Sequence, residues 1–155
     1  MPKYYNASIR NLVYRLRRFK PILDEELRNE ILRHEDIIID MVANEQMYEY
    51  GIEGRGIEMM SYMPYSRRTI QKKIRKGQPY NRVTLRDTGE FHKSLFVEFD
   101  EGGFYVTSTD DKAQYLLSRY GKTIFRLTNE NLNILLREYI KPSLIEKMKE
   151  YIKHG

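Results

Sequence analysis

The chain has 155 residues, a formal net charge of +5 and no cysteine, which excludes a disulfide framework, a cysteine-ligated zinc and a cysteine nucleophile. This length can bury a core of its own, so we expect a single domain over residues 1–155. No apolar run approaches the ~20 residues of a membrane span, and the first residues lack the apolar core of a secretory signal, so the sequence predicts a soluble protein that is not exported.

Two helices are predicted in the first third of the chain. The first is indicated by apolar residues at helical spacing, namely Ile9, Leu12, Val13 and Leu16. Pro21 is expected to end this helix because proline lacks the N–H that an interior position needs. A second helix is predicted from about Leu23 to Tyr48, with acidic side chains favourably placed in its first turn.

Three glycines in six residues, at 51, 54 and 56, predict a flexible loop or arm at about 50–65, with a short strand from Ile57 to Tyr62. Tyrosines and methionines flank these glycines. Both residue types are common in protein interfaces, where part of the side chain is buried and part remains in contact with solvent. The sequence therefore predicts an interface with a neighbouring subunit. Its candidate residues are Met47, Tyr50, Ile52, Arg55, Met59, Met60, Tyr62, Met63, Arg67 and Arg68.

Charge is distributed in blocks along the chain. Residues 21–60 hold three basic and eleven acidic side chains, whereas residues 61–86 hold eight basic and none acidic. A basic helix is predicted from Arg67 to Lys76, closed by Gly77. Its basic face can be a solvated surface, it can pair with the acidic segment of another subunit, or it can contact DNA phosphates non-specifically. The candidate DNA contacts are Lys72, Lys73, Arg75 and Lys76.

The second half of the chain predicts a β-hairpin followed by helices. Strand-forming residues on both sides of Gly102 and Gly103 predict a hairpin at 94–109. Helices are expected from Lys112 to Tyr120, from an N-cap at Thr128, and after Pro142 with Ser143 and Glu146 as a capping box. The predicted class is α+β, with a small antiparallel sheet packed by N-terminal and C-terminal helices.

Asp87, Thr88 and Gly89 match the Asp-Thr-Gly motif of aspartic proteases. In those enzymes, two aspartate carboxyls share a proton in the active site. Arg86 and Glu90 flank the three residues, and two such charges are costly beside a buried carboxyl pair. The alternative is a structural turn formed by Asp87, Thr88 and Gly89 that leads to a strand opening at Ser94. The dimeric protease remains a third functional hypothesis.

Other catalytic arrangements have little support in the sequence. The three histidines are isolated and lack metal-ligand spacing, so no metal or cofactor is predicted. His92 lies near Asp87 and Ser94, and a Ser-His-Asp triad is conceivable, but a triad requires a three-dimensional geometry that spacing alone does not supply. We therefore expect no catalytic residues.

The order of features after Val83 resembles the minor tail component and tail-completion proteins of tailed bacteriophages. Thr88 and Gly89 match the family's turn, Phe91 its bulky apolar residue, Ser94 its strand opener, Tyr115 with Tyr120-Gly121 its tyrosine segment, and Pro142 the proline before its last helix. The chain departs from the family at 119–123, where relatives commonly have Glu-x-Gly-Thr, and at 124–129, where many continue with Pro-Phe.

This resemblance implies a structural virion protein that joins head to tail at the phage neck and has no enzymatic activity. It implies a homo-oligomeric ring, with portal, connector or tail-tube subunits as further partners, assembled in the bacterial host cytoplasm. Closed rings require two unlike faces on each subunit, and opposed charge blocks can supply them. The alternative function is a basic nucleic-acid-binding module.

Overall fold

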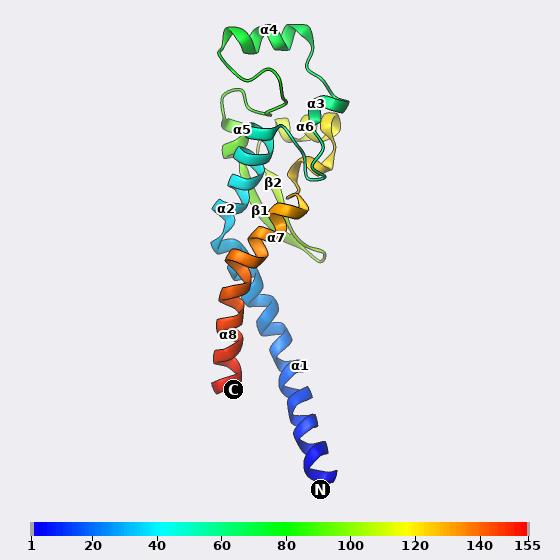
Figure 1. The fold of residues 1–155 in the computed structure, drawn as a ribbon, viewed down its shortest axis with the longest axis vertical. Coiled ribbons are helices and arrows are strands. Elements are labelled where there is room, and N and C mark those ends of the chain that lie inside the picture. The colour runs from blue at the N-terminus through cyan, green and yellow to red at the C-terminus, as the bar shows by residue number, and fades with distance from the viewer. Residues whose placement is uncertain (1, 155) are drawn as a thin grey trace. The chain divides into compact units, whose positions relative to one another are not determined.

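The computed structural model describes residues 2–154, with side chains for residue 14 and for 17–154. The chain divides into two compact units, one formed by residues 1–34 with 135–155 and the other by residues 35–134 (Figure 1). Within residues 2–154, no helix is both long enough and apolar enough to cross a membrane.

The first unit begins with one long helix, α1, from Pro2 to Arg33. The predicted break at Pro21 is wrong, because α1 continues through this proline. Pro21 and Arg17 are both exposed, so water can satisfy the carbonyl that proline leaves without a donor. The side chains that predicted the first helix, at residues 9, 12, 13 and 16, lie outside the described side chains.

The other helices of this unit are the π-helix η3, Leu135–Ile140, and α8, Lys141–His154, which packs on α1. Pro142 does not break the helix, because η3 runs into α8 without a gap. The π-helical turn of η3, which changes the hydrogen-bond pattern directly before the proline, is where the missing N–H is accommodated. The predicted capping box is wrong, since α8 already includes Ser143 and Glu146. Ser143 instead bonds Glu30, and Glu146 pairs with Lys149 at 3.4 Å.

A buried carboxylate joins α1 to α8. The Glu30 side chain is almost fully buried and accepts a hydrogen bond from Lys147 Nζ at 3.2 Å and another from Arg33. Lys147 also pairs with Glu26. Burial acts to raise the pKa of Glu30, but hydrogen bonds from Ser143 and Lys147 and the charges of Arg33 and Lys147 together lower it. Glu30 is therefore ionised at neutral pH and stabilises the helix pair.

The second unit starts with α2, Glu35–Asp40, and the π-helix η1, Met41–Tyr50. The predicted helix at 23–48 thus spans the end of α1, α2 and most of η1, with a turn at His34 between α1 and α2. Ile38, Val42 and Met47 are fully buried and supply core contacts from this segment. η1 ends at Gly51, which has a positive φ of 62° and whose N–H bonds the carbonyl of Met47 at 3.1 Å.

The glycine segment after η1 forms a hydrogen-bonded loop. Ile52 pairs with Glu58 in a single antiparallel bridge, and the Gly54 N–H donates to the carbonyl of Thr123 at 2.8 Å. The short strand predicted at 57–62 is wrong, because Met59–Tyr62 forms a helix, α3. The carboxylate of Glu53 fixes the conformation of this loop, because it accepts hydrogen bonds from the backbone amides of Arg55 and Ile57.

The hairpin is confirmed, and with it the α+β class. β1, Leu95–Asp100, pairs antiparallel with β2, Gly103–Ser108, in a register that joins Val97 to Val106. Within the second unit, α2 packs on β1, and the carboxylate of Glu35 accepts a hydrogen bond from the Val97 amide at 2.8 Å.

Three helices follow the hairpin in the second unit: α6, Lys112–Tyr120; the 3-10 helix η2, Lys122–Phe125; and α7, Asn129–Ile134. The predicted N-cap at Thr128 is confirmed by a hydrogen bond from the Asn131 amide to Thr128 Oγ1, at 3.2 Å. Buried Gln46 joins η1 to this region, donating to the carbonyl of Arg126 and accepting from Thr128 and Asn131. These contacts hold η1 against the segment that precedes α7.

Candidate functional site

The predicted basic helix is α4, Arg67–Arg75. Ser66 caps its start, since the Ser66 hydroxyl accepts a hydrogen bond from the Thr69 amide at 3.2 Å. Gly77, with a φ of 67°, follows its end, as the sequence predicts. Arg67, Arg68, Lys72 and Arg75 are exposed.

Lys73 does not belong with these exposed cations. Its side chain is buried, and its Nζ donates to the carbonyl of Arg86 at 3.3 Å and lies 5.2 Å from the centre of the Tyr65 ring. The predicted DNA contact at Lys73 is therefore wrong, because this ammonium group faces the protein interior. Lys76, also among those predicted contacts, pairs with Asp87 at 2.7 Å.

The segment from Thr84 to Gly89 forms a constrained turn beside Lys73. Leu85 has a φ of 52°, an uncommon conformation for a residue with a side chain. The turn is held by Thr84, whose amide donates to the Tyr65 hydroxyl at 3.1 Å and whose carbonyl bonds His92 Nε2 at 3.0 Å. Such strain persists where surrounding contacts impose it and is often found at functional sites.

Gly89 precedes a short helix, α5, Glu90–Lys93. The structural turn predicted at 87–89 is present, and Gly89 has the positive φ, 89°, that a side chain would disfavour. The strand does not follow directly, because α5 intervenes and Ser94 caps its C-terminal end. Phe91 of α5 is buried, with its ring centre 6.1 Å from that of Phe125.

Asp87 lies in an environment unlike that of an aspartic protease dyad. Its carboxylate is half exposed and bonds Lys76 at 2.7 Å and Gln78 at 3.3 Å. The hydrogen bond from Lys76 holds the pKa of Asp87 below its ordinary value, with Gln78 and the charge of Lys72 adding to the effect. A dyad requires the opposite shift in one of its carboxyls, so this geometry does not suit the protease mechanism.

His92 and Ser94 do not form a triad with Asp87. His92 is buried and bonds the carbonyl of Thr84, and burial lowers its pKa. The Ser94 hydroxyl lies 2.6 Å from both the carbonyl of Phe91 and the Ser108 hydroxyl. The Ser94–Ser108 contact closes the start of the hairpin, so these groups serve the fold.

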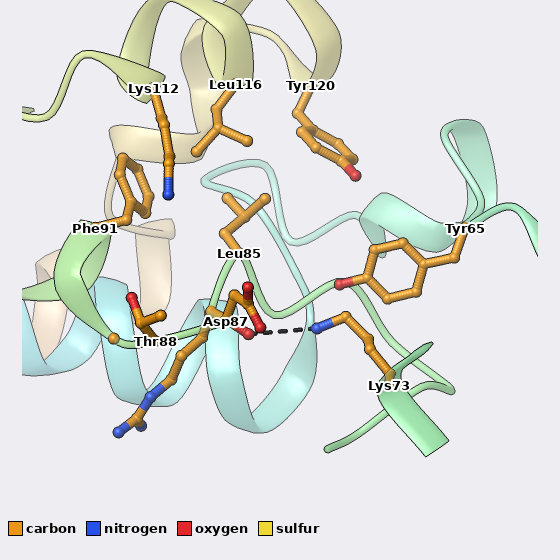
Figure 2. Close-up of a pocket in the computed structure, with 11 residues that line it drawn as sticks. Tyr65, Lys73, Leu85, Asp87, Thr88, Phe91, Lys112, Leu116 and Tyr120 are labelled. Atoms are coloured by element: carbon orange, nitrogen blue, oxygen red, sulfur yellow. Dashed lines mark hydrogen bonds between the residues drawn. The ribbon is translucent and has the colours of Figure 1, made fainter. Parts of the chain in front are cut away.

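A cavity of about 210 Å³ joins α4, the 85–89 turn and α6 (Figure 2). It brings Lys73 of the predicted basic helix together with the predicted turn. Its walls are formed by Tyr65, Lys73, Leu85, Arg86, Asp87, Thr88, Gly89, Phe91, Lys112, Leu116 and Tyr120. We call it the Lys73 cavity. Exposed side chains, among them Lys112 and Thr88, form its rim, so it opens to solvent.

Polar groups from three segments point into the Lys73 cavity. Figure 2 shows the ammonium group of Lys112 and the hydroxyl of Tyr120 on one side of Leu85, and the Tyr65 hydroxyl and Lys73 ammonium on the other. Burial lowers the pKa of Lys73, although the charge of Asp87 opposes this. Burial likewise raises the pKa values of Tyr65 and Tyr120, so both phenols are protonated at neutral pH. The cavity therefore offers hydrogen-bond donors and positive charge, together with the Asp87 carboxylate, beside the apolar side chains of Leu85, Phe91 and Leu116.

None of the predicted interface residues lines this cavity, and two of them are not at the surface. Met47 and Met59 are fully buried, so they are core residues and the prediction that they contact a neighbour is wrong. Apolar burial is the usual role of methionine at helical spacing, and the sequence could not separate it from an interface. Met60 and Met63 are half-buried.

The remaining members of the predicted interface reach the surface to different degrees. Tyr50 is exposed, and Ile52 is half-buried. Arg55 is exposed and pairs with Glu53 at 3.0 Å, while the Tyr62 hydroxyl donates to the carbonyl of Tyr120 at 2.8 Å. Arg67 and Arg68 are exposed at the start of α4.

Sequence reasoning missed Lys112 and Leu116, which enter the site from α6. They come from a segment 39 residues after Lys73, and only the tertiary fold brings the two together. One signal was present for Lys73 itself. It lies three residues after Ile70, on the same helical face, which places it towards the interior.

Comparison of the chain with protein families, with curated proteins and with solved structures found no match. Within the described residues, no group of three or more histidine, aspartate or glutamate side chains is placed to hold a metal ion.

Proposed function

We propose that this chain is a structural virion protein of a tailed bacteriophage, a non-enzymatic neck or tail-completion subunit that assembles into a ring between head and tail. The observation that carries the proposal is the arrangement of the residues on which the family resemblance depends. Gly89 forms the turn, Phe91 is buried against Phe125, and Ser94 closes the hairpin through Ser108. The turn, the buried aromatic residue and the start of the hairpin support the proposal, while α5 lies between the turn and the strand.

The electrostatics of the site also support a role in assembly. Asp87, His92 and Ser94 are engaged in contacts that maintain the turn, the short helix and the hairpin. The Lys73 cavity combines the positive charge of Lys73 and Lys112 with a phenol donor and apolar side chains, a combination that suits the binding of an anionic group.

The proposal is tested by light scattering on the purified chain at low and high salt. Because heterologous contacts propagate around a symmetry axis, a ring gives a mass that is a fixed multiple of the monomer, and electron microscopy shows closed particles. Co-purification with portal or tail-tube subunits is the expected result if the ring forms only on a partner. A salt-insensitive monomer that binds no virion protein would overturn the proposal.

DNA binding is a second candidate function, favoured by the exposed cations of α4. Arg67, Arg68, Lys72 and Arg75 are exposed on a single short helix, and residues 61–86 contain no acidic side chain. Such a surface binds phosphates with an affinity that falls steeply as salt rises. Neutralising Lys72 and Arg75 would weaken duplex binding uniformly across sequences if this function holds, and no salt-dependent binding would exclude it.

A further inference from the structure

The Lys73 cavity contains a buried cation whose hydrogen bond goes to a carbonyl oxygen and not to a carboxylate, although the charge of Asp87 acts on it. Lys73 Nζ has a neutral carbonyl acceptor at 3.3 Å, that of Arg86, and the nearby Asp87 carboxylate is engaged by Lys76. Arg86, although it lines the cavity, stacks over the ring of Tyr48 at 4.9 Å. Burial of an ammonium group that is not hydrogen-bonded to a carboxylate is costly, and a carboxylate from outside would reduce that cost.

Further donors are available for the same carboxylate. The Tyr65 oxygen accepts the Thr84 amide and also contacts the Thr84 side chain, and its phenol O–H is a donor that a carboxylate can engage. Lys112 is exposed at the rim, and Figure 2 shows its ammonium group directed towards the cavity. A carboxylate on the Lys73 side of Leu85 could therefore receive a charge-assisted hydrogen bond from Lys73 and a phenol hydrogen bond from Tyr65, while the charge of Lys112 at the rim attracts it to the cavity.

The size of the cavity indicates what kind of group enters it. About 210 Å³ is smaller than the roughly 300–1,000 Å³ typical of small-molecule sites. It has room for an acidic side chain with part of its backbone. The ligand class that fits is a protein carboxylate carried on a projecting segment.

The same unit carries such a segment at the far end of its hairpin. The hairpin tip, Asp100–Gly103, is exposed at every residue. Asp100 Oδ1 accepts the Gly102 amide at 2.7 Å, which shapes the turn, whereas the Glu101 side chain is exposed and forms no ion pair with any described residue. A strand of six residues, about 20 Å long, separates this tip from the turn at 85–89. One subunit therefore cannot fill its own cavity with its own tip.

We propose that the hairpin tip of a second copy of this chain inserts Glu101 into the Lys73 cavity, past Lys112 at the rim and towards Lys73. This inference rests on the proposed function and specifies the contact by which the ring closes. The two surfaces are unlike and lie at opposite ends of one unit, as a heterologous, head-to-tail interface requires.

A charge exchange between two variants tests the contact. In Glu101→Lys two lysines meet at each contact between copies, and in Lys112→Glu two glutamates meet there. The dissociation constant for self-association of each variant alone should therefore be at least about tenfold higher than that of the native chain. Mixing the two in equal amounts should restore assembly. In a particle in which the two variants alternate, residue 101 of each hairpin tip meets a residue 112 of opposite charge at the next cavity. Both positions are exposed, so both variants should fold, which circular dichroism checks.

Controls separate this contact from a general effect of charge. Glu98→Lys and Lys93→Glu change exposed charges elsewhere on the unit and should leave the particle mass unchanged. Lys73→Met tests the buried cation, because it keeps an unbranched side chain while removing the charge, and it should also weaken association.

The outcomes distinguish this inference from the proposed function. If the native chain forms rings and both single variants form them equally well, the Glu101 contact is overturned and the ring function stands. If the exchange restores association but the particles are open filaments, the contact stands and the ring is overturned. A native chain that is monomeric both alone and with virion partners would overturn both.

Discussion

Glu53 shows how one residue can organise a glycine-containing loop. Its carboxylate is fully buried and accepts hydrogen bonds from the Arg55 amide at 3.0 Å, the Arg55 guanidinium at 3.0 Å and the Ile57 amide at 3.3 Å. Burial acts to raise the pKa of Glu53, but hydrogen bonds from Thr123, Arg55 and Ile57 together lower it. The ionised carboxylate therefore substitutes for the backbone partners that an irregular loop lacks.

Glu53→Gln is expected to lower the free energy of unfolding at pH 7 by about 1–3 kcal/mol, because the amide cannot accept all of these hydrogen bonds. The measurement is urea denaturation, with Glu58→Gln, an exposed residue of the same loop, as the matched control. The difference between native chain and variant should narrow on acidification, since a carboxyl with a lowered folded pKa loses its contribution as pH falls through that pKa. Equal stability of both variants at pH 7 would contradict the prediction.

Gly54 illustrates a second requirement at the residue scale, which is close backbone approach. A Cβ added at Gly54 would lie 2.4 Å from the Cβ of Arg126 and 2.7 Å from its carbonyl oxygen. Neither group is a flexible side-chain end, so the backbone would have to move.

Gly54→Ala is therefore expected to destabilise the chain by about 1–3 kcal/mol, measured by thermal or urea unfolding. Gly102→Ala is the matched control, because its added Cβ would meet one atom of the Asp100 side chain at 3.3 Å. The prediction fails if alanine costs no more at 54 than at 102.

At the scale of elements, α4 depends on its cap more than on burial. It has nine residues, Lys73 is its one buried side chain, and Ile74 is 54% exposed. Short helices are marginal without tertiary contacts, so the hydrogen bond from the Thr69 amide to Ser66 has a large share in holding the helix.

Ser66→Ala is expected to cost about 0.5–2 kcal/mol, because it leaves the Thr69 amide without its acceptor. Amide hydrogen exchange should show the loss concentrated at residues 70–76, and Ser61→Ala, an exposed hydroxyl outside α4, should leave these amides protected. A loss spread evenly over the second unit would count against a local capping role.

At the scale of the whole molecule, buried titratable groups make stability depend on pH in one direction. Glu30 in the first unit and Glu53 in the second have lowered pKa values, and burial lowers the pKa of His92. In each case the unfolded chain binds protons more readily than the folded chain as pH falls. The three contributions therefore add on acidification.

The free energy of unfolding is expected to decrease from pH 7.5 to pH 4, beginning below about pH 6.5, where unfolded histidine takes up its proton. His92→Gln, whose amide can still donate to the carbonyl of Thr84, should lose the part of this decrease between about pH 6.5 and 5. Urea denaturation at several pH values measures both effects. A pH-independent free energy of unfolding would contradict the assignment.

Local patterns in the sequence determined the elements whose partners are near in the chain. The hairpin at 95–108, the basic helix at 67–75, the N-cap at Thr128 and the α+β class all follow from turn chemistry and periodicity, and these were predicted correctly. Local patterns predicted helix breaks at Pro21 and Pro142, but both prolines lie inside helices. At these positions solvent or a neighbouring helical turn accommodates the missing N–H of the proline.

The tertiary structure alone decided which side chains are buried and which meet. It placed Met47 and Met59 in the core, held the glycine loop through Glu53, turned Lys73 inward and brought Lys112 to it from α6. The physical reason is that burial and desolvation depend on contacts between segments far apart in the chain. Periodicity shows which face of a helix a residue occupies, but it does not show what covers that face.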